Sequence, residues 1–400
     1  MNEVTQDTLE CVVEVGHFER HKKKQFVCGD TFLSTRIREE NRSICVLSDG
    51  LGSGVKASVL STLTSTMAAN FTAGYHDIRK SAKIIMNTLP VCRERKISYA
   101  TFTIIDIDGG GMARIIEYDN PACCIIRNGT FFQPEVTKIQ GRARGKRPYI
   151  LRYYTFPIQE GDRIICFSDG VTQSGIGIDR FPLGWGENNV AMFIQEALVK
   201  RPGMSARDLA RQVVERSMLN DRNLALDDIS CGVIYYRRPR ELMIVSGPPF
   251  NPSNDSQMAA IYEKHTGHRI ICGGTTAKII ARELEKTILL EPGLPFSNLP
   301  PTSSMEGATL VTEGIITLQR VADMLKSYTP ADEVDMSPVR QIVELMLDSD
   351  IITFIAGTRI NDAYQDPSLP QEIALRRSIL REIVHYLEND YLKETRLKFI

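Results

Sequence analysis

Two copies of the tripeptide Ser-Asp-Gly stand out in this sequence, because each follows an apolar run that predicts a strand. They occupy residues 48–50, within SDGLGSG, and residues 168–170. Two further acidic points flank them: Asp30 follows the run QFVC, and the pair Asp227 and Asp228 precedes the run ISCGVIYY. Aspartates at the ends of four predicted strands could therefore gather into one cluster of carboxylates.

Such a cluster favours a binding site for divalent cations. Hard divalent cations prefer carboxylate and carbonyl oxygens, and a pair of ions needs several converging carboxylates. Without a cation, neighbouring carboxylates repel one another and raise one another's pKa. A single Asp-Gly is more often a β-turn. Four acidic points at strand ends, two of them in a repeated tripeptide, indicate a metal site instead.

The glycines Gly50, Gly52 and Gly54 also suggest a dinucleotide-binding turn. The spacing G-x-G-x-x-G is absent, however, and Asp49 would place a carboxylate where a pyrophosphate needs backbone N–H groups. We therefore reject a dinucleotide site.

The elements around these aspartates predict a first domain over residues 1–238. Helical patterns cover only residues 53–89, where we expect two helices broken near Ala73-Gly74, and residues 189–220. Two helix pairs around a large antiparallel β-structure predict an α+β domain, a helix–sheet–sheet–helix sandwich. The strand-like runs are rich in β-branched and aromatic residues and cover residues 11–15, 25–28, 43–48, 99–107, 113–118, 122–127, 149–156, 162–168 and 229–236.

Residues 239–400 alternate strand and helix patterns, which predicts a smaller α/β domain with a mainly parallel sheet. Its predicted strands end in glycine-bearing turns, above all Gly273-Gly274-Thr275-Thr276. Such turns line the carboxyl edge of a parallel sheet, and free N–H groups at a helix start suit an anion. Ordinary tight-turn chemistry explains the glycines equally well. We expect a regulatory or ligand-sensing module that takes a small anionic ligand.

The order GD, SDGLGSG, SDGVTQ and DDIS resembles the metal-dependent protein phosphatases of type 2C. The closest branch is the bacterial one typified by the stage II sporulation phosphatase E and the regulators of anti-anti-sigma factors. The segment EGDRIICFSDGVTQ is similar to a characteristic segment of that branch. The resemblance covers residues 11–236, and its four ordered motifs are specific.

The resemblance implies a two-metal site with Mn²⁺ or Mg²⁺, in which Asp49 bridges both ions and acts with Asp30 in catalysis. It also implies attack on phosphorus by a metal-activated water without a phospho-enzyme. In the family outside this bacterial branch, an arginine near the first strand often holds the substrate phosphate. Arg20 and the run at residues 21–24 are the candidates here, and a polar turn explains them equally well. By position, the implied metal ligands are Asp30, Asp49, the Gly50 carbonyl, Asp169 and Asp227, with Asp228 as the alternative to Asp227.

The amino-acid composition argues against several other classes of protein. The 400 residues include 48 Lys and Arg against 49 Asp and Glu, so the chain lacks the basic excess of a nucleic-acid wrapper. No apolar stretch approaches the roughly 18 residues of a spanning helix, and the polar start MNEVTQDTLE is not a signal peptide. Nine cysteines without a C-x-x-C pair do not suggest a disulfide scaffold or a zinc ribbon. We expect a cytoplasmic protein that binds neither nucleic acid nor membranes.

Together these observations predict a protein serine/threonine phosphatase, a phosphoric monoester hydrolase of bacterial signalling. Its substrate would be a phosphorylated protein, for example an anti-anti-sigma-like regulator. The alternative is a degenerate, non-catalytic module that binds or senses a partner, but such a copy has no chemical reason to keep its carboxylates together. The sequence does not decide whether the substrate is a phosphorylated protein or a small-molecule phosphate. It also does not decide whether the protein is a homodimer.

Overall fold

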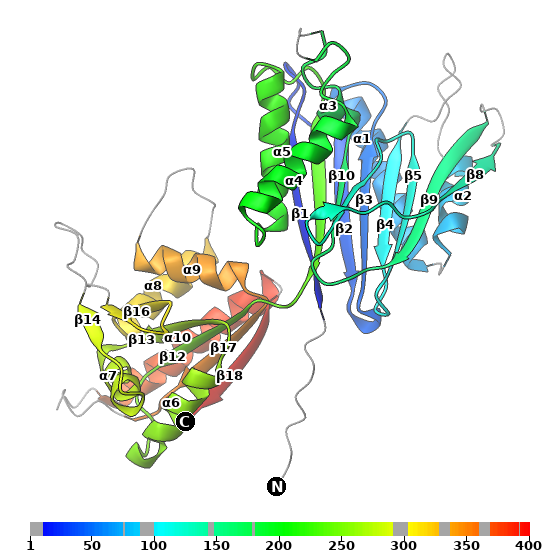
Figure 1. Ribbon diagram of the computed structural model, residues 1–400. Coiled ribbons are helices and arrows are strands. Elements are labelled where there is room, and N and C mark those ends of the chain that lie inside the picture. Colours follow the sequence, from blue (N-terminus) through cyan, green and yellow to red (C-terminus); the bar gives the residue numbers. More distant parts are fainter. Residues whose placement is uncertain are drawn as a thin grey trace. The chain divides into compact units, whose positions relative to one another are not determined.

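The computed structural model divides the chain into two compact units, Met1–Arg238 and Pro239–Ile400 (Figure 1). No helix in the described part of the chain is both long and apolar enough to span a membrane. The structure describes residues 11–74, 77–88, 100–142, 148–177, 181–290, 303–327, 337–359, 369–391 and 393–400.

The first unit contains two antiparallel sheets (Figure 1). The first sheet has the order β1 (Val12–Arg20), β11 (Ile229–Arg237), β10 (Arg163–Phe167), β6 (Cys124–Arg127) and β7 (Thr130–Phe131). The second has the order β2 (Asp30–Ile37), β3 (Arg42–Asp49), β4 (Phe102–Ile107), β5 (Met112–Tyr118), β9 (Tyr149–Pro157) and β8 (Val136–Gly141).

Helices cover the outer face of each sheet. On the second sheet lie α1 (Gly54–Gly74) and α2 (Ile78–Thr88), and on the first lie α4 (Glu187–Lys200) and α5 (Ala206–Asn220). The short α3 (Asp169–Thr172) follows β10. Helix α5 begins after Ser205, whose hydroxyl caps it by accepting a 3.1 Å hydrogen bond from the Asp208 N–H.

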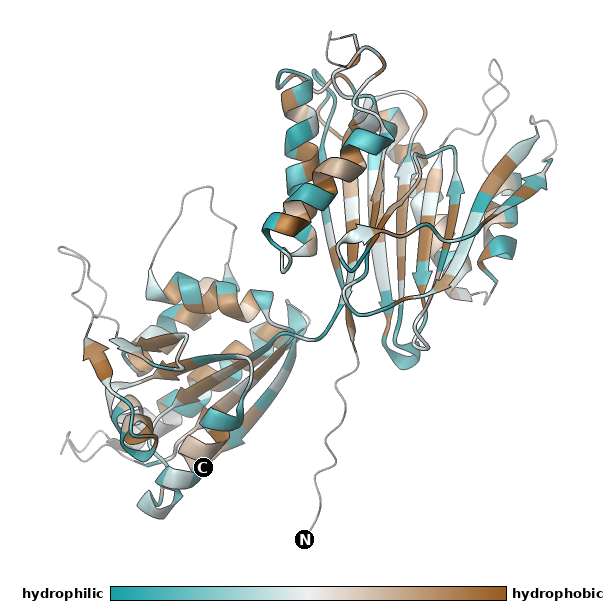
Figure 2. Cartoon of the chain, viewed as in Figure 1, coloured by the Kyte–Doolittle hydropathy of each residue, from teal (hydrophilic) through white to brown (hydrophobic). Residues whose placement is uncertain are grey.

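Strand β3 shows why these layers form. Ile44 and Val46 face the core under α1 and α2, whereas Cys45 and Leu47 face the core between the sheets. Side chains alternate along a strand, so a strand that is apolar at every position must be buried on both faces. Figure 2 shows apolar residues running along the strands of this unit. The predicted helix–sheet–sheet–helix sandwich is confirmed.

The strand predicted at residues 25–28 is wrong, because this stretch is a loop and β2 begins only at Asp30. Lys24 has a φ of 67°, which an extended strand does not allow. The loop then turns outward, and the Phe26 side chain is 97% exposed.

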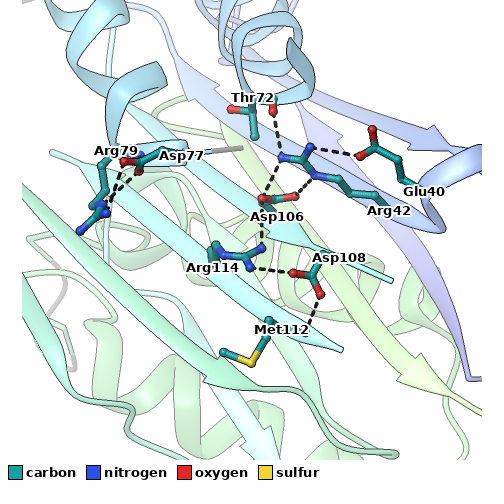
Figure 3. A network of polar contacts seen from close by, with 9 residues as sticks. All are labelled: Glu40, Arg42, Thr72, Asp77, Arg79, Asp106, Asp108, Met112 and Arg114. Carbon is teal, nitrogen blue, oxygen red and sulfur yellow. Dashed lines mark hydrogen bonds and ion pairs between the residues drawn. The ribbon is translucent and has the colours of Figure 1, made fainter. Parts of the chain in front are cut away.

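A buried ionic network ties the end of α1 to the second sheet (Figure 3). The Arg42 guanidinium donates to both carboxylate oxygens of Asp106, at 2.7 and 3.0 Å, and to the Thr72 carbonyl of α1 at 2.9 Å. Asp106 and Arg42 are almost completely buried. Arg114 links Asp106 to Asp108 at the far end of β4. The network therefore fixes the helix that begins just after Asp49.

The second unit is an α/β layer structure around one sheet, and its predicted fold class is confirmed. Pairing is parallel except at β15, which is antiparallel to both neighbours. The strand order is β14 (Ile288–Leu290), β15 (Ser303–Met305), β16 (Leu310–Thr312), β13 (His268–Cys272), β12 (Glu241–Ser246), β17 (Ile351–Ala356) and β18 (Glu394–Phe399). One core contains α6 (Asp255–Lys264) and α7 (Gly274–Glu283), and the other contains α8 (Ile315–Lys326), α9 (Pro338–Asp348) and α10 (Leu369–Asn389).

Candidate metal centre

Antiparallel pairing brings the acidic residues to one end of both sheets. In an antiparallel pair, the start of one strand lies beside the end of its neighbour. Asp30 at the start of β2 is directly opposite Asp49 at the end of β3. The start of β11, after Asp227 and Asp228, lies likewise beside the end of β10, which leads into Asp169. Only the expected position of Asp30 is corrected: it lies at the start of β2 and not at the end of a strand over residues 25–28.

Three glycines allow these segments to approach closely. A Cβ added at Gly29 would lie 2.7 Å from Oδ2 of Asp228, and one at Gly170 would lie 2.0 Å from the Asp228 carbonyl oxygen. A Cβ at Gly50 would lie 2.0 Å from the Ala57 carbonyl oxygen in α1. Any side chain at these positions would push the backbone segments apart. The glycines of the GD and SDG motifs are therefore required by close packing.

Asp30 is the most deeply buried of the candidate ligands, with 4% of its surface exposed. Burial is the main reason that its pKa rises to about 7; the hydroxyls of Ser168 and Ser230 oppose the rise, and the carboxylate of Asp228 adds to it. Its Oδ2 is buried without a hydrogen-bond partner among the described residues. A buried carboxylate oxygen that lacks a donor fits a cation as its missing partner.

Asp49 and Asp169 complete the repelling cluster. Burial first, and then the nearby carboxylates of Asp30, Asp169 and Asp227, raise the pKa of Asp49 to about 9. Burial, and then Asp227, raise the pKa of Asp169, while the amide of Gln173 donates a 2.8 Å hydrogen bond to Asp169 Oδ2. A bound cation would relieve this mutual repulsion.

The adjacent pair Asp227 and Asp228 divides between two sides of the cluster. Asp228 is 5% exposed, and its Oδ1 accepts a 2.9 Å hydrogen bond from the Lys22 N–H. The half-exposed Asp227 forms a 3.1 Å ion pair with the Lys22 ammonium. Asp227 raises the pKa of Asp49 and Asp169, so its charge lies near both of these candidate ligands. Both members of the pair therefore border the cluster.

No three His, Cys, Asp or Glu side chains in the described segments already surround a common metal position. Lys22 and Gln173 instead occupy oxygens of Asp227 and Asp169. The donor set nevertheless fits a hard divalent cation, since it consists of carboxylate oxygens in a partly dry environment. Asp30 and Asp49 lie opposite each other, and Gly50 follows Asp49 at the same edge.

We expect the metal-free protein to lose stability as the pH rises from about 4 to about 9. Folding raises the pKa of Asp30 from 3.8 to about 7 and that of Asp49 from 3.8 to about 9. Both carboxyls therefore hold protons more tightly in the folded state, and their contribution is lost as the pH rises through the folded values. Urea denaturation across this range, with EDTA or Mn²⁺, measures the effect. A flat or rising free energy of unfolding with EDTA would contradict it.

Replacing Lys22 with Met should tighten Mn²⁺ binding by up to about fivefold. This factor corresponds to the free energy that one exposed ion pair contributes. The Lys22 ammonium lies 3.1 Å from Asp227 Oδ1 and so competes with a cation for this carboxylate. Isothermal titration calorimetry measures the affinity. Lys23→Met is the matched control, because Lys23 is exposed. Equal affinities in both variants would show that Lys22 does not compete.

Sequence reasoning missed several polar residues of this cluster. Gln173, Ser168 and Ser230 contact candidate ligands or alter their pKa. Their only signal is their position beside the motifs SDGVTQ and DDIS. Lys22 belongs to the basic run considered for phosphate binding. Its ion pair with Asp227 could not be predicted, because the two residues are 205 positions apart in the sequence.

In the second unit, Gly273 follows β13 directly and α7 begins at Gly274. Gly273 has a φ of 123°, which a side chain would strain. The Thr276 hydroxyl accepts a 2.9 Å hydrogen bond from the Gly247 N–H and so links two turns. The turn lies at the carboxyl edge of the sheet as expected, and the anionic ligand stays a prediction.

Comparison with known proteins identifies the first unit. Residues 39–237 match the family model of Stage II sporulation protein E (SpoIIE), which confirms the resemblance seen in the sequence. No curated protein matches the chain.

Several solved structures are similar at low identity. The PP2C phosphatase domain with a regulatory-domain fragment of SpoIIE from Bacillus subtilis is 17% identical, with a TM-score of 0.46 over 58% of this chain and 65% of that chain. The RsbU and RsbW domains of Rv1364c from Mycobacterium tuberculosis are 16% identical, with a TM-score of 0.45 over 64% and 68%. RsbX in complex with magnesium is 19% identical, with a TM-score of 0.38 over 56% and 95%.

Proposed function

Since residues 39–237 match the SpoIIE family model, we propose that the first unit is a metal-dependent protein serine/threonine phosphatase. One observation carries the proposal: buried aspartates from four segments repel one another, and Asp30 Oδ2 lacks a donor among the described residues. The substrate would be phosphoserine or phosphothreonine on a bacterial signalling protein. An anti-anti-sigma-like regulator is the first candidate.

Two Mn²⁺ or Mg²⁺ ions are proposed as the cofactor. The residues that would hold them are Asp30, Asp49, Asp169 and Asp227, with the Gly50 carbonyl as a further ligand and Asp228 as the alternative to Asp227. When bound, the ions would activate a water for attack on phosphorus and stabilise charge on the phosphoryl oxygens.

The protein's own groups would orient these ligands. Ser168 and Ser230 lie against Asp30 and favour its ionised form. Gln173 holds one oxygen of Asp169 through its amide. Such hydrogen bonds to a ligand's free oxygen fix its orientation before the substrate arrives. Water is largely excluded at Asp30, which strengthens the attraction between carboxylate and cation.

Arg20 is proposed to hold the substrate phosphate. Its guanidinium lies 4.7 Å from the centre of the Phe18 ring, and Arg20 lines the same cavity as Asp30. It forms no ion pair with any described residue. A guanidinium so placed can donate two parallel hydrogen bonds to a phosphate. Residues 239–400 are proposed as the regulatory unit, and a homodimer stays a prediction.

Hydrolysis assays on the purified full chain test the proposal. We expect p-nitrophenyl phosphate and a phosphoserine peptide to be hydrolysed with Mn²⁺ or Mg²⁺. Activity should disappear with EDTA and return with added Mn²⁺. The alternative function, a non-catalytic module that binds a partner, predicts no hydrolysis of either substrate with any divalent cation.

A further inference from the structure

A cavity of about 780 Å³ opens beside Asp30 at the edge of the sandwich. It lies where β1 and β2, the edge strands of the two sheets, run next to the loop at residues 21–29. Asp30 is part of its wall, so the cavity borders one of the candidate metal ligands. Its lining includes the aromatic residues His17, Phe18, Phe26 and Phe32 and the polar residues Glu19, Arg20, His21 and Asp30.

Stacked rings form part of the cavity wall. The ring of His17 on β1 and the ring of Phe32 on β2 are nearly parallel, with their centres 4.8 Å apart. Gly232 of β11 pairs with His17, and a Cβ at Gly232 would lie 2.3 Å from the Phe32 ring. The absence of a side chain at Gly232 therefore lets Phe32 reach across from the second sheet. The wall is built by contacts between both sheets.

The aromatic part of the wall suits an apolar group. Burial lowers the pKa of His17 to about 4, so its ring is neutral at physiological pH and stacks as an uncharged aromatic. At the mouth, the Phe26 side chain is 97% exposed and its neighbour Val27 is 38% exposed. Aromatic side chains prefer to pack against other rings, edge-to-face or offset-stacked. Exposed aromatic residues at a cavity mouth are also the type enriched in protein interfaces.

The position of the cavity restricts its occupant. A phosphorylated side chain at the aspartate cluster would place the neighbouring residues of its own chain beside Asp30. The cavity is large enough for a side chain of any size, and aromatic residues form part of its lining. Neither a free phosphate nor a metal ion would form favourable contacts with these aromatic rings.

We propose that this cavity is a specificity subsite, which binds a large apolar or aromatic side chain next to the phosphorylated residue of a protein substrate. The proposal rests on the proposed phosphatase function. It adds that the enzyme selects substrates by sequence, with Phe26 as the residue that closes over the bound side chain.

Binding of labelled peptides tests the subsite without turnover. The peptides carry a non-hydrolysable phosphonate in place of phosphoserine, and Phe replaces Ala at each of the two positions on either side. Fluorescence anisotropy with Mn²⁺ should show about tenfold tighter binding for one Phe peptide than for the all-Ala peptide. Phe26→Ser should remove most of this preference. Phe131→Ser is the control, because Phe131 is 43% exposed on β7, at the opposite edge of the first sheet.

The outcomes separate the subsite from the catalytic function. Equal binding of all peptides by the wild type, or an unchanged preference in Phe26→Ser, would overturn the subsite. Hydrolysis of p-nitrophenyl phosphate by the wild type is measured in parallel. A Phe preference without hydrolysis would support the subsite and reject the phosphatase, whereas hydrolysis without a preference would do the reverse.

Discussion

Replacing Asp49 with Asn should reduce Mn²⁺-dependent hydrolysis by more than about 100-fold, since even partners of metal ligands cost 10–100-fold when removed. Asp49 lies opposite Asp30. Burial, and then the negative charges of three other candidate ligands, Asp30, Asp169 and Asp227, raise its pKa. Asn keeps the size of the side chain but removes the negative charge that a bridging ligand needs.

The same variant should fold normally and resist denaturation at high pH better than the wild type without metal. The pKa of Asp49 is raised to about 9 by burial and repulsion, so its ionisation destabilises the metal-free protein. Initial rates across a Mn²⁺ titration, with thermal denaturation, measure both effects.

Asp108→Asn is the matched control, because Asp108 follows β4 at the end of the sheet opposite Asp49. Its carboxylate pairs with Arg114, away from the cluster. This variant should keep its activity. Near-normal rates for Asp49→Asn at saturating Mn²⁺ would reject the assigned metal centre.

Replacing Arg42 with Met should lower the free energy of unfolding of the first unit by about 3–5 kcal/mol. The substitution leaves the completely buried Asp106 without its main partner and removes a donor from the Thr72 carbonyl. A buried carboxylate that loses its cation cannot recover the interaction from water. Trp185, the single tryptophan, is buried in the first unit, so its fluorescence reports this unit during urea denaturation.

Arg79→Met is the comparison within the same region (Figure 3). Arg79 is 54% exposed and pairs with Asp77 at 3.0 Å, so its loss should cost less than about 1 kcal/mol. The double variant Arg42→Met with Asp106→Leu should recover most of the lost stability, because both charges are then removed. Equal losses for Arg42→Met and Arg79→Met would mean that the buried network does not stabilise the unit.

The sequence allowed the layers of the first unit to be predicted because its strands carry unambiguous patterns. A run such as SICVLS is apolar on both faces and must lie between two cores, as Ile44 and Leu47 do. Helix α8 was predictable from residue 315 to residue 326 for a similar reason, since its apolar residues recur with helical spacing. The loop at residues 25–28 could not be predicted, because its apolar residues have the pattern of a strand. The left-handed φ of Lys24, which ends any extended conformation there, is not visible in the sequence.

The candidate ligands could be named from motif order, but their surroundings could not. Lys22 and Asp227 are 205 positions apart, and only the pairing of β1 with β11 brings them together. From the sequence, Asp227 and Asp228 are alternative candidates for the same metal ligand. Their different burial follows from the close approach of Gly29 and Gly170 to Asp228, which depends on the three-dimensional fold.

Anomalous scattering from a Mn²⁺-soaked crystal tests the central claim most directly. The account predicts strong manganese peaks bounded by Asp30, Asp49, Asp169 and Asp227, with Lys22 moved away from Asp227. The absence of any peak among these carboxylates at saturating Mn²⁺, with the Lys22–Asp227 pair intact, would contradict it.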